Sequence, residues 1–163
     1  MQKIILYPFN INYLETFASE KKLLLQRLGN AIHEIHHVGS TPIADLLSKP
    51  IIDIVIEAQI FPPSQEIIKL MATLSYEFKG EAGVEGRFWF TKGEPRLFNL
   101  HYCAVGSEIV KNQILFRDAL LRDENLRREY ENIKLANAGK GDIDSSDYAL
   151  AKSDLIRKVI DNK

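Results

Sequence analysis

The chain has 163 residues, of which 45% are hydrophobic and 26% are charged, and its formal net charge is -1. These values are typical of a globular protein and exclude a disordered or fibrous chain. A net charge near zero gives no general field that attracts a polyanion, which disfavours a dedicated nucleic-acid binder. A chain of this length can build one core, and we expect residues 1–163 to form a single domain.

The cysteine count and the apolar segments bear on the compartment. Cys103 is the only cysteine, so no disulfide can form within the chain. The start MQKIILYPF has neither the apolar length nor the cleavage site of a signal peptide. No apolar stretch reaches the roughly 20 residues that a membrane-spanning helix needs. We therefore expect a cytoplasmic protein that does not cross a membrane.

The first third of the chain predicts a helix and two strands. Residues 10–29 repeat apolar side chains at helical spacing and end in Gly-Asn, which predicts an amphipathic helix. The segment AIHEIHHVG, residues 31–39, follows so closely that a strand is the better interpretation. Ser40 or Thr41 is then expected to cap a short helical turn with Pro42 at its first position. Residues 51–56 follow as a buried strand.

The middle of the chain predicts a helix and a hairpin. Ser64, after two prolines, can cap a helix that continues to about residue 74. The segments RFWFT and RLFNLHYCAV, residues 87–91 and 96–105, are then expected to form an antiparallel hairpin. Period two places Asn99, His101 and Cys103 on the face opposite Phe98.

The chain from residue 107 onward has three apolar stripes at helical spacing, with Gly139-Lys140-Gly141 as a break. A mixed α+β architecture buries all these faces: a sheet of four or five strands packed by helices, followed by a helical C-terminal part.

One carboxylate is out of place in this pattern. The stretch KPIIDIVIEA puts Asp53 inside a run of β-branched residues, where an ionised group without a partner costs several kcal/mol. It must therefore reach a cleft or a partner. Gly39-Ser40, at the end of the preceding strand, can let a phosphate approach and donate to it, and a helix start there would add positive charge. An aspartate on the next strand could hold Mg²⁺ against that phosphate.

The segment HVGSTPIADLLSKPIIDIVIEA, together with YPFNINYLETFASEK, EFKGEAGVEGRFWFTKGEPRLFNLHY and LFRDALLRDENLRREYENIKLA, resembles the GrpB-like proteins, a family placed in the nucleotidyltransferase superfamily. The resemblance runs nearly the whole chain. It implies a nucleotidyltransferase-like fold in which Gly39 and Ser40 contact nucleotide phosphate. It also implies that Asp53 is the first acid of a metal-binding strand.

Four departures from the family pattern weaken the case for transfer chemistry. Active nucleotidyltransferases carry an acid-x-acid pair on this strand, and here the second position is Val55. A third carboxylate is expected on a later strand, which instead offers Asn99 and His101. The H-H-L-H run of the family is F-N-L-H here, and its Pro-Gly is Ala44-Asp45. A two-metal mechanism of the usual type is not supported.

Further side chains complete the predicted site, each with a structural alternative. Lys49, Arg87 and Arg117 could neutralise phosphate, or each could be an ordinary ion-pair partner. For Arg117 that structural role would be a pair with Asp118 or a contact with a neighbouring helix. His101 could act as an acid, a base or a ligand, with Asn99 beside it, or it could be a structural histidine. Asp53 itself could be salt-bridged to Lys49 or to an arginine.

Two main hypotheses follow. The first is a Mg²⁺-assisted nucleotidyltransferase acting on a nucleoside triphosphate and an unknown acceptor, with Asp53 and His101 as catalytic residues and Asp53 as the metal ligand. Its phosphate-contacting residues would be Gly39, Ser40, Lys49, Arg87, Asn99 and Arg117. The second is a non-catalytic module that binds a nucleotide or another small phosphorylated ligand. A scaffold whose helical C-terminal part meets a partner is a third, weaker interpretation.

Overall fold

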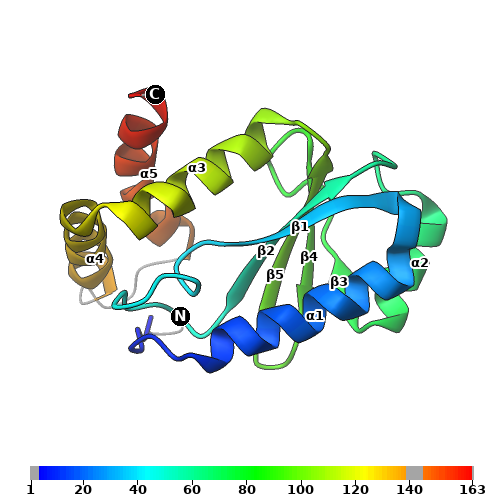
Figure 1. Ribbon diagram of the computed structural model, residues 1–163, viewed down its shortest axis with the longest axis horizontal. Helices are drawn as coiled ribbons and strands as arrows, with labels where there is room; N and C mark the ends of the chain where they lie inside the picture. Colours follow the sequence, from blue (N-terminus) through cyan, green and yellow to red (C-terminus); the bar gives the residue numbers. More distant parts are fainter. Residues whose placement is uncertain (1–3, 139–144, 163) are drawn as a thin grey trace.

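The computed structural model of the chain describes residues 4–138 and 145–162, with the side chains of the last helix described from residue 148 (Figure 1). Its strands are β1 (Ile32–Val38), β2 (Ile52–Ala58), β3 (Tyr76–Phe78), β4 (Arg87–Lys92) and β5 (Phe98–Ala104). Its α-helices are α1 (Asn12–Leu28), α2 (Gln65–Thr73), α3 (Glu108–Arg122), α4 (Glu124–Ala138) and α5 (Ser145–Asp161). A short 3₁₀ turn, Gly29–Ala31, joins α1 to β1.

The strands form one mixed sheet in the order β1-β2-β5-β4-β3. The central pair β2 and β5 is parallel, whereas β1 with β2, β4 with β5, and β3 with β4 are antiparallel. The predicted architecture, a mixed sheet of four or five strands packed by helices with a helical C-terminal part, is confirmed. The break predicted at 139–141 lies outside the described residues.

Alternation along β2 sends its side chains to two different environments. Ile52, Ile54 and Ile56 are completely buried against the helices α1 and α2, in the main hydrophobic core. Asp53, Val55 and Glu57 occupy the opposite face. Part of that second face is covered by α3, whose Val110 packs with Val55 in a smaller apolar cluster. The position of Asp53 therefore follows from strand periodicity, because its neighbours in sequence fill the other face.

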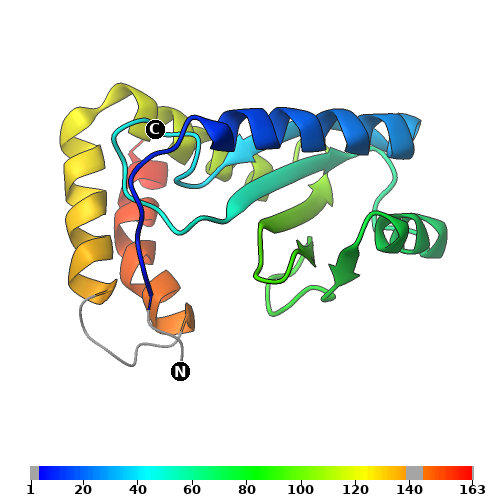
Figure 2. The ribbon, with the colours of Figure 1, turned by 90° about the horizontal axis from the view of Figure 1, so that it is seen from below.

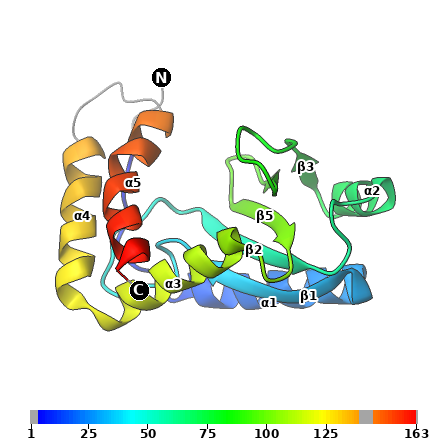
Figure 3. The ribbon, with the colours of Figure 1, turned by 90° about the horizontal axis from the view of Figure 1, so that it is seen from above.

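The α4–α5 hairpin stands at one end of the sheet, where the two helices lie side by side (Figures 2 and 3). A third apolar cluster joins α3, α4 and α5 to the loop between β1 and β2, through Ile43 and Leu46. The segment after Ser40 was expected to be a short helical turn, and this is wrong: residues 39–45 form bends and turns instead. The Ile43 amide donates to the Ser40 carbonyl at 3.1 Å, which closes a single turn, and Ile43 and Leu46 pack in the helical cluster.

One predicted element is confirmed at its start, and one element was missed by the sequence interpretation. The helix α2 begins as predicted, with Ser64 Oγ accepting a hydrogen bond from the Ile67 amide at 3.3 Å. The edge strand β3 was not predicted, because three residues are too few to show a period. Among the described residues, no helix has the length and apolar content needed to cross a membrane.

Candidate anion-binding site

The Asp53 carboxyl lies against the turn that follows β1. Strand pairing sets Val38 opposite Asp53, so Gly39 and Ser40 continue directly past this side chain. Gly39 has φ of +73°, and a Cβ atom placed there would lie 2.4 Å from Oδ2 of Asp53. Only glycine allows this approach, for steric as well as conformational reasons. The turn and the acid therefore form one local unit.

On its other side Asp53 meets the neighbouring strand. Asn99 stands opposite Asp53 in the parallel pair β2–β5, and its side-chain amide donates a hydrogen bond to Oδ1 at 3.2 Å. In the described parts of the chain, 4–138 and 145–162, the amide oxygen of Asn99 is buried and has no hydrogen-bond partner. Ser48 Oγ is likewise buried without a partner. Such groups are uncommon in folded proteins and are costly unless a ligand or water satisfies them.

Three lysines surround this unit, and we call them the lysine cluster: Lys49, Lys134 and Lys152. Lys134, on α4, is 2% exposed and donates to Ser40 Oγ at 3.1 Å and to the Leu47 carbonyl. Lys49 and Lys152 share one aromatic ring, with their ammonium nitrogens 4.6 Å and 4.3 Å from the centroid of Tyr148. The hairpin α4–α5 thus brings two cations to a loop that lies far from it in sequence.

The protonation of the site reflects this crowding. Burial raises the pKa of Asp53, while the hydrogen bond from Asn99 and the three ammonium groups oppose that rise. Burial lowers the pKa of Lys134 to about 7 and that of Lys152 to about 8. Burial also lowers the pKa of Lys49, and the nearby Arg96 lowers it further. Burial therefore disfavours the cationic forms of these lysines more than the described carboxylates Asp53 and Glu131 favour them.

The predicted residues His101 and Arg87 lie on the same face but farther along the strands. His101 is two residues beyond Asn99, and its Nδ1 is 3.2 Å from Nε2 of Gln113. Burial and the Arg87 guanidinium lower the pKa of His101 to about 4, so its imidazole is neutral at pH 7. Arg87 stands opposite Cys103, four residues beyond Asn99, which is about 13 Å along the strand. The register thus separates Arg87 from Asp53.

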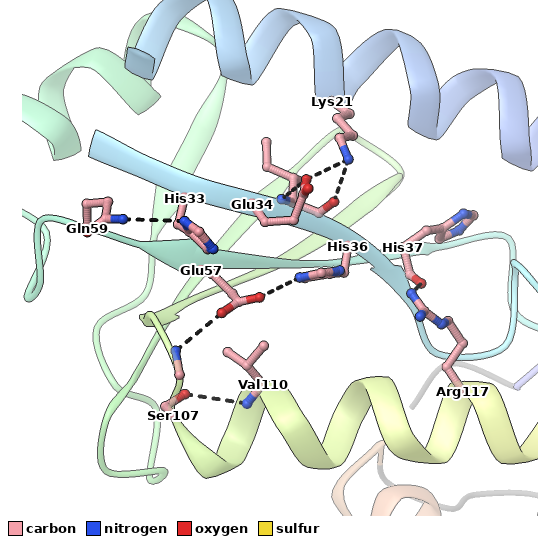
Figure 4. A network of polar contacts seen from close by, with 12 residues as sticks. Lys21, His33, Glu34, His36, His37, Glu57, Gln59, Ser107, Val110 and Arg117 are labelled. Atoms are coloured by element: carbon pink, nitrogen blue, oxygen red, sulfur yellow. Dashed lines mark hydrogen bonds and ion pairs between the residues drawn. The ribbon is translucent and has the colours of Figure 1, made fainter. Parts of the chain in front are cut away.

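Arg117 has structural partners. It forms an ion pair with Asp118 at 2.8 Å and donates to the backbone carbonyl of His37 at 3.1 Å. Figure 4 shows this side chain reaching from α3 to the end of β1, together with the pair of His36 and Glu57 at 2.7 Å. Glu57 also accepts from the Gly106 amide at 3.2 Å. These contacts fasten α3 to the sheet, which is the structural alternative considered for Arg117.

The metal-binding capacity of the site is small. In the part of the chain that the structure describes, no group of three or more His, Cys, Asp or Glu residues could hold a metal ion. Val55, at the position of the second acid, is completely buried. Asp53 could supply one carboxylate ligand, and Mg²⁺ would have to complete its shell with phosphate oxygens and water.

Comparison with known proteins shows the family of the chain. Residues 3–162 match the family described as GrpB protein. The chain belongs to the GrpB family. It is 34% identical to the UPF0157 protein YqkA of Bacillus subtilis over 162 residues, covering 99% of this chain and 47% of that protein. It is 32% identical to the UPF0157 protein SCO7215 of Streptomyces coelicolor, covering 96% of this chain and 82% of that protein.

A solved structure supports the fold of this GrpB protein. The crystal structure of the conserved protein GrpB from Enterococcus faecalis matches with a TM-score of 0.80 at 24% identity, covering 94% of this chain and 98% of that chain. The chain spans about half the length of the Bacillus subtilis relative. The comparisons thus show the family and the fold of the chain.

Sequence reasoning missed two members of the site of this GrpB protein, Lys134 and Lys152. A signal for them exists, because Tyr130 and Lys134 on α4 and Tyr148 and Lys152 on α5 repeat the same Tyr-x-x-x-Lys spacing. Residues four apart share a helix face, so each lysine can lie over its own tyrosine. The ammonium of Lys134 is 5.0 Å from the Tyr130 ring centroid.

Proposed function

We propose that this GrpB protein binds a small phosphorylated ligand beside Asp53, at the Gly39-Ser40 turn, with the lysine cluster neutralising the phosphate. The observation that carries the proposal is Lys134: a nearly fully buried ammonium that reaches Ser40 Oγ. The helix start expected after Ser40 is absent, so these lysines are the source of positive charge at the turn. A phosphorylated ligand, and not a particular reaction, is what this arrangement supports best.

The charge balance favours an anion. Among the residues whose side chains the structure describes, the cations that act on one another here are the lysine cluster and Arg96, and the carboxylates acting on them are Asp53 and Glu131. Glu131 also accepts a hydrogen bond from the Leu47 amide at 2.8 Å, so it is shared between this backbone group and Lys134. A buried charge without enough partners is expensive. A bound phosphate would restore the balance and return the lysines to their ordinary protonation.

The hydrogen-bonding groups also suit a phosphate. The Gly39 backbone has no side chain to keep an oxygen away. The Ser40 hydroxyl accepts from Lys134 and also hydrogen-bonds with Tyr130, and a phosphate oxygen would replace Tyr130 as its acceptor. Ser48 Oγ is a further buried hydroxyl in this loop that has no partner. Lysine serves as a point charge at such sites. Asp53 then positions the lysines by its negative charge and keeps the turn in place through Gly39.

A second candidate is Mg²⁺-assisted transfer of a nucleotidyl group from a nucleoside triphosphate to an acceptor. One observation favours it: Oδ2 of Asp53 lies against Gly39, so that a cation held by this carboxylate would share the same phosphate. When bound, Mg²⁺ would neutralise the phosphate charge. Within the described residues Asp53 would be its carboxylate ligand, and His101, neutral at pH 7, could handle a proton. The lysine cluster is an alternative to Mg²⁺ as the group that neutralises the phosphate charge.

Thermal unfolding with inorganic phosphate, pyrophosphate and nucleotides, each with and without Mg²⁺, tests the proposal. A ligand at 100 times its Kd adds about 2.7 kcal/mol, which is roughly 8 °C in Tm for a chain of this size. The variants are Lys134→Met and Lys152→Met. Lys158→Met is the control, because Lys158 is an exposed lysine on the same helix as Lys152.

The two candidates give different results. A Mg²⁺-independent shift that is lost in Lys134→Met and Lys152→Met, but kept in Lys158→Met, supports phosphate binding by the lysine cluster. A shift that requires Mg²⁺, disappears in Asp53→Asn and is accompanied by pyrophosphate release supports nucleotidyl transfer. If no phosphorylated compound shifts the Tm, both candidates are contradicted and the scaffold hypothesis is favoured.

A further inference from the structure

An aromatic residue lies on the same sheet face as the anion-binding site and takes no part in the contacts described above. Trp89, on β4, stands opposite His101 of β5. Residues opposite one another on paired strands point to the same side of a sheet. His101 shares its face with Asn99, which contacts Asp53. Trp89 and Asp53 therefore point to the same side.

The distance between them follows from the strand arrangement. Trp89 and Asp53 are separated by two strand spacings and by two residues along the strand, which gives roughly 12 Å between their Cα atoms. Gly39 lies one strand spacing and one residue farther, roughly 17 Å from Trp89, whereas the lysine cluster acts on Asp53 and so reaches the nearer end of this span. A nucleoside carrying two or three phosphate groups can bridge such a span. The Trp89 side chain is half-buried, so part of its surface stays open to solvent.

Arg96 connects the tryptophan with the lysine cluster. Its guanidinium carbon is 5.1 Å from the centroid of the Trp89 ring. Its charge also acts on Lys49, whose pKa it lowers. Arg96 is exposed, so its side chain can move to admit a planar group. Tryptophan and arginine are both surfaces on which nucleobases stack.

We propose that the ligand is a nucleoside phosphate whose base stacks on Trp89 and Arg96 while its phosphates lie at Gly39, Ser40 and the lysine cluster. This inference rests on the proposed function, since it names the chemical class of the same ligand. Stacking does not depend on base edges, and therefore the site is expected to accept several bases. A stacked base tightens binding by about 5- to 100-fold over a phosphate compound without one.

The chain carries its own reporter for this inference, because Trp89 is its only tryptophan. Intrinsic fluorescence is measured during titration of the wild-type protein with ADP, GDP, CDP, UDP and pyrophosphate. A base stacked on the indole quenches its emission, whereas pyrophosphate, which lacks a base, leaves the emission nearly unchanged. Calorimetry then gives the affinities for wild type, Trp89→Leu, Trp89→Phe and Arg96→Gln.

The matched control is Phe88→Leu, next to Trp89 on the same strand. Its ring faces the opposite side, where it packs at 5.6 Å from Phe61. We expect Trp89→Leu to weaken nucleotide binding at least fivefold without changing pyrophosphate binding, Trp89→Phe to retain most of the affinity, and Phe88→Leu to leave both affinities unchanged.

The outcomes separate the two proposals. If pyrophosphate and the nucleoside diphosphates bind equally well, without quenching and without an effect of Trp89→Leu, the base platform is wrong and the phosphate site stands. If neither pyrophosphate nor any nucleotide binds, both proposals fail. Tighter binding of nucleotides together with quenching supports the platform.

Discussion

Replacing Gly39 by alanine probes the contact between the turn and Asp53. The new Cβ atom would lie 2.4 Å from Oδ2 of Asp53 and 3.1 Å from its Cγ, so the carboxyl has to move. A left-handed backbone costs alanine about 1–2 kcal/mol. Moving the carboxyl also breaks the hydrogen bond from Asn99, worth about 1.5–3 kcal/mol for a charged acceptor. Gly39→Ala should therefore lose about 3–5 kcal/mol, or roughly 9–15 °C in Tm.

Gly106→Ala is the matched control for this substitution. Gly106 has the same φ of +73°, but nothing lies within 4 Å of a Cβ atom placed there. This variant should lose only the backbone cost of about 1–2 kcal/mol. The free energies of unfolding are measured by urea denaturation followed by circular dichroism, with Gly39→Ala also made in an Asp53→Ala background.

The double-mutant cycle separates the steric contact from the backbone cost. Removing the carboxyl should reduce the penalty of Gly39→Ala towards that of Gly106→Ala, with only the 3.1 Å contact to the Cβ atom of residue 53 remaining. Equal penalties for the two glycine variants in the wild-type background would show that the Asp53 carboxyl does not oppose a side chain at residue 39. A penalty of Gly39→Ala that does not depend on residue 53 would do the same.

Three further predictions concern stability. Ser64→Ala should lose about 1 kcal/mol, because its hydroxyl caps α2, and an unchanged Tm would contradict the cap. Glu20→Ala should lose about 2–3 kcal/mol in urea unfolding, since Glu20 accepts from Tyr76 at 2.9 Å and pairs with Lys92 at 2.8 Å; a loss below 1 kcal/mol would argue against this network. Lys134, with its pKa lowered to about 7, binds fewer protons folded than unfolded, so its contribution makes the ligand-free protein more stable as pH rises from about 7 towards 10. Lys134→Met should remove that part of the rise between pH 7 and 9, and an identical pH profile for both proteins would disprove the shift.

Much of the fold follows from local patterns. The helix α1, the capped helix α2 and the hairpin β4–β5 have strong periodicity and clear start and stop residues, and they form as predicted. The turn after Ser40 does not, because Ile43 and Leu46 are held by contacts with α3 and α5 that no local pattern reveals. The strand β3 is a three-residue edge element whose pairing with β4 fixes it.

The candidate site divides in the same way. The adjacency of Asp53, Gly39 and Asn99 could be anticipated, because strand alternation and a turn after β1 are local consequences of sequence. The separation of Arg87 from Asp53 depends on strand register, which the sequence of the hairpin does not specify alone. Lys134 is more than 80 residues from Ser40 and Leu47, to which it donates hydrogen bonds, and only tertiary packing of the helix pair α4–α5 brings it there.

Proton uptake on ligand binding shows whether the lysine cluster holds the phosphate. A phosphate monoester such as ribose 5-phosphate is almost fully ionised at pH 8, since its second pKa is about 6, so a change in protonation on binding occurs on the protein. Lys134 and Lys152 are partly neutral at that pH, and a bound phosphate would raise their pKa values. Calorimetric titration in two buffers of different ionisation enthalpy should show net proton uptake that shrinks in Lys134→Met. Binding without proton uptake, or uptake that the variant retains in full, would contradict the lysine cluster as the phosphate site.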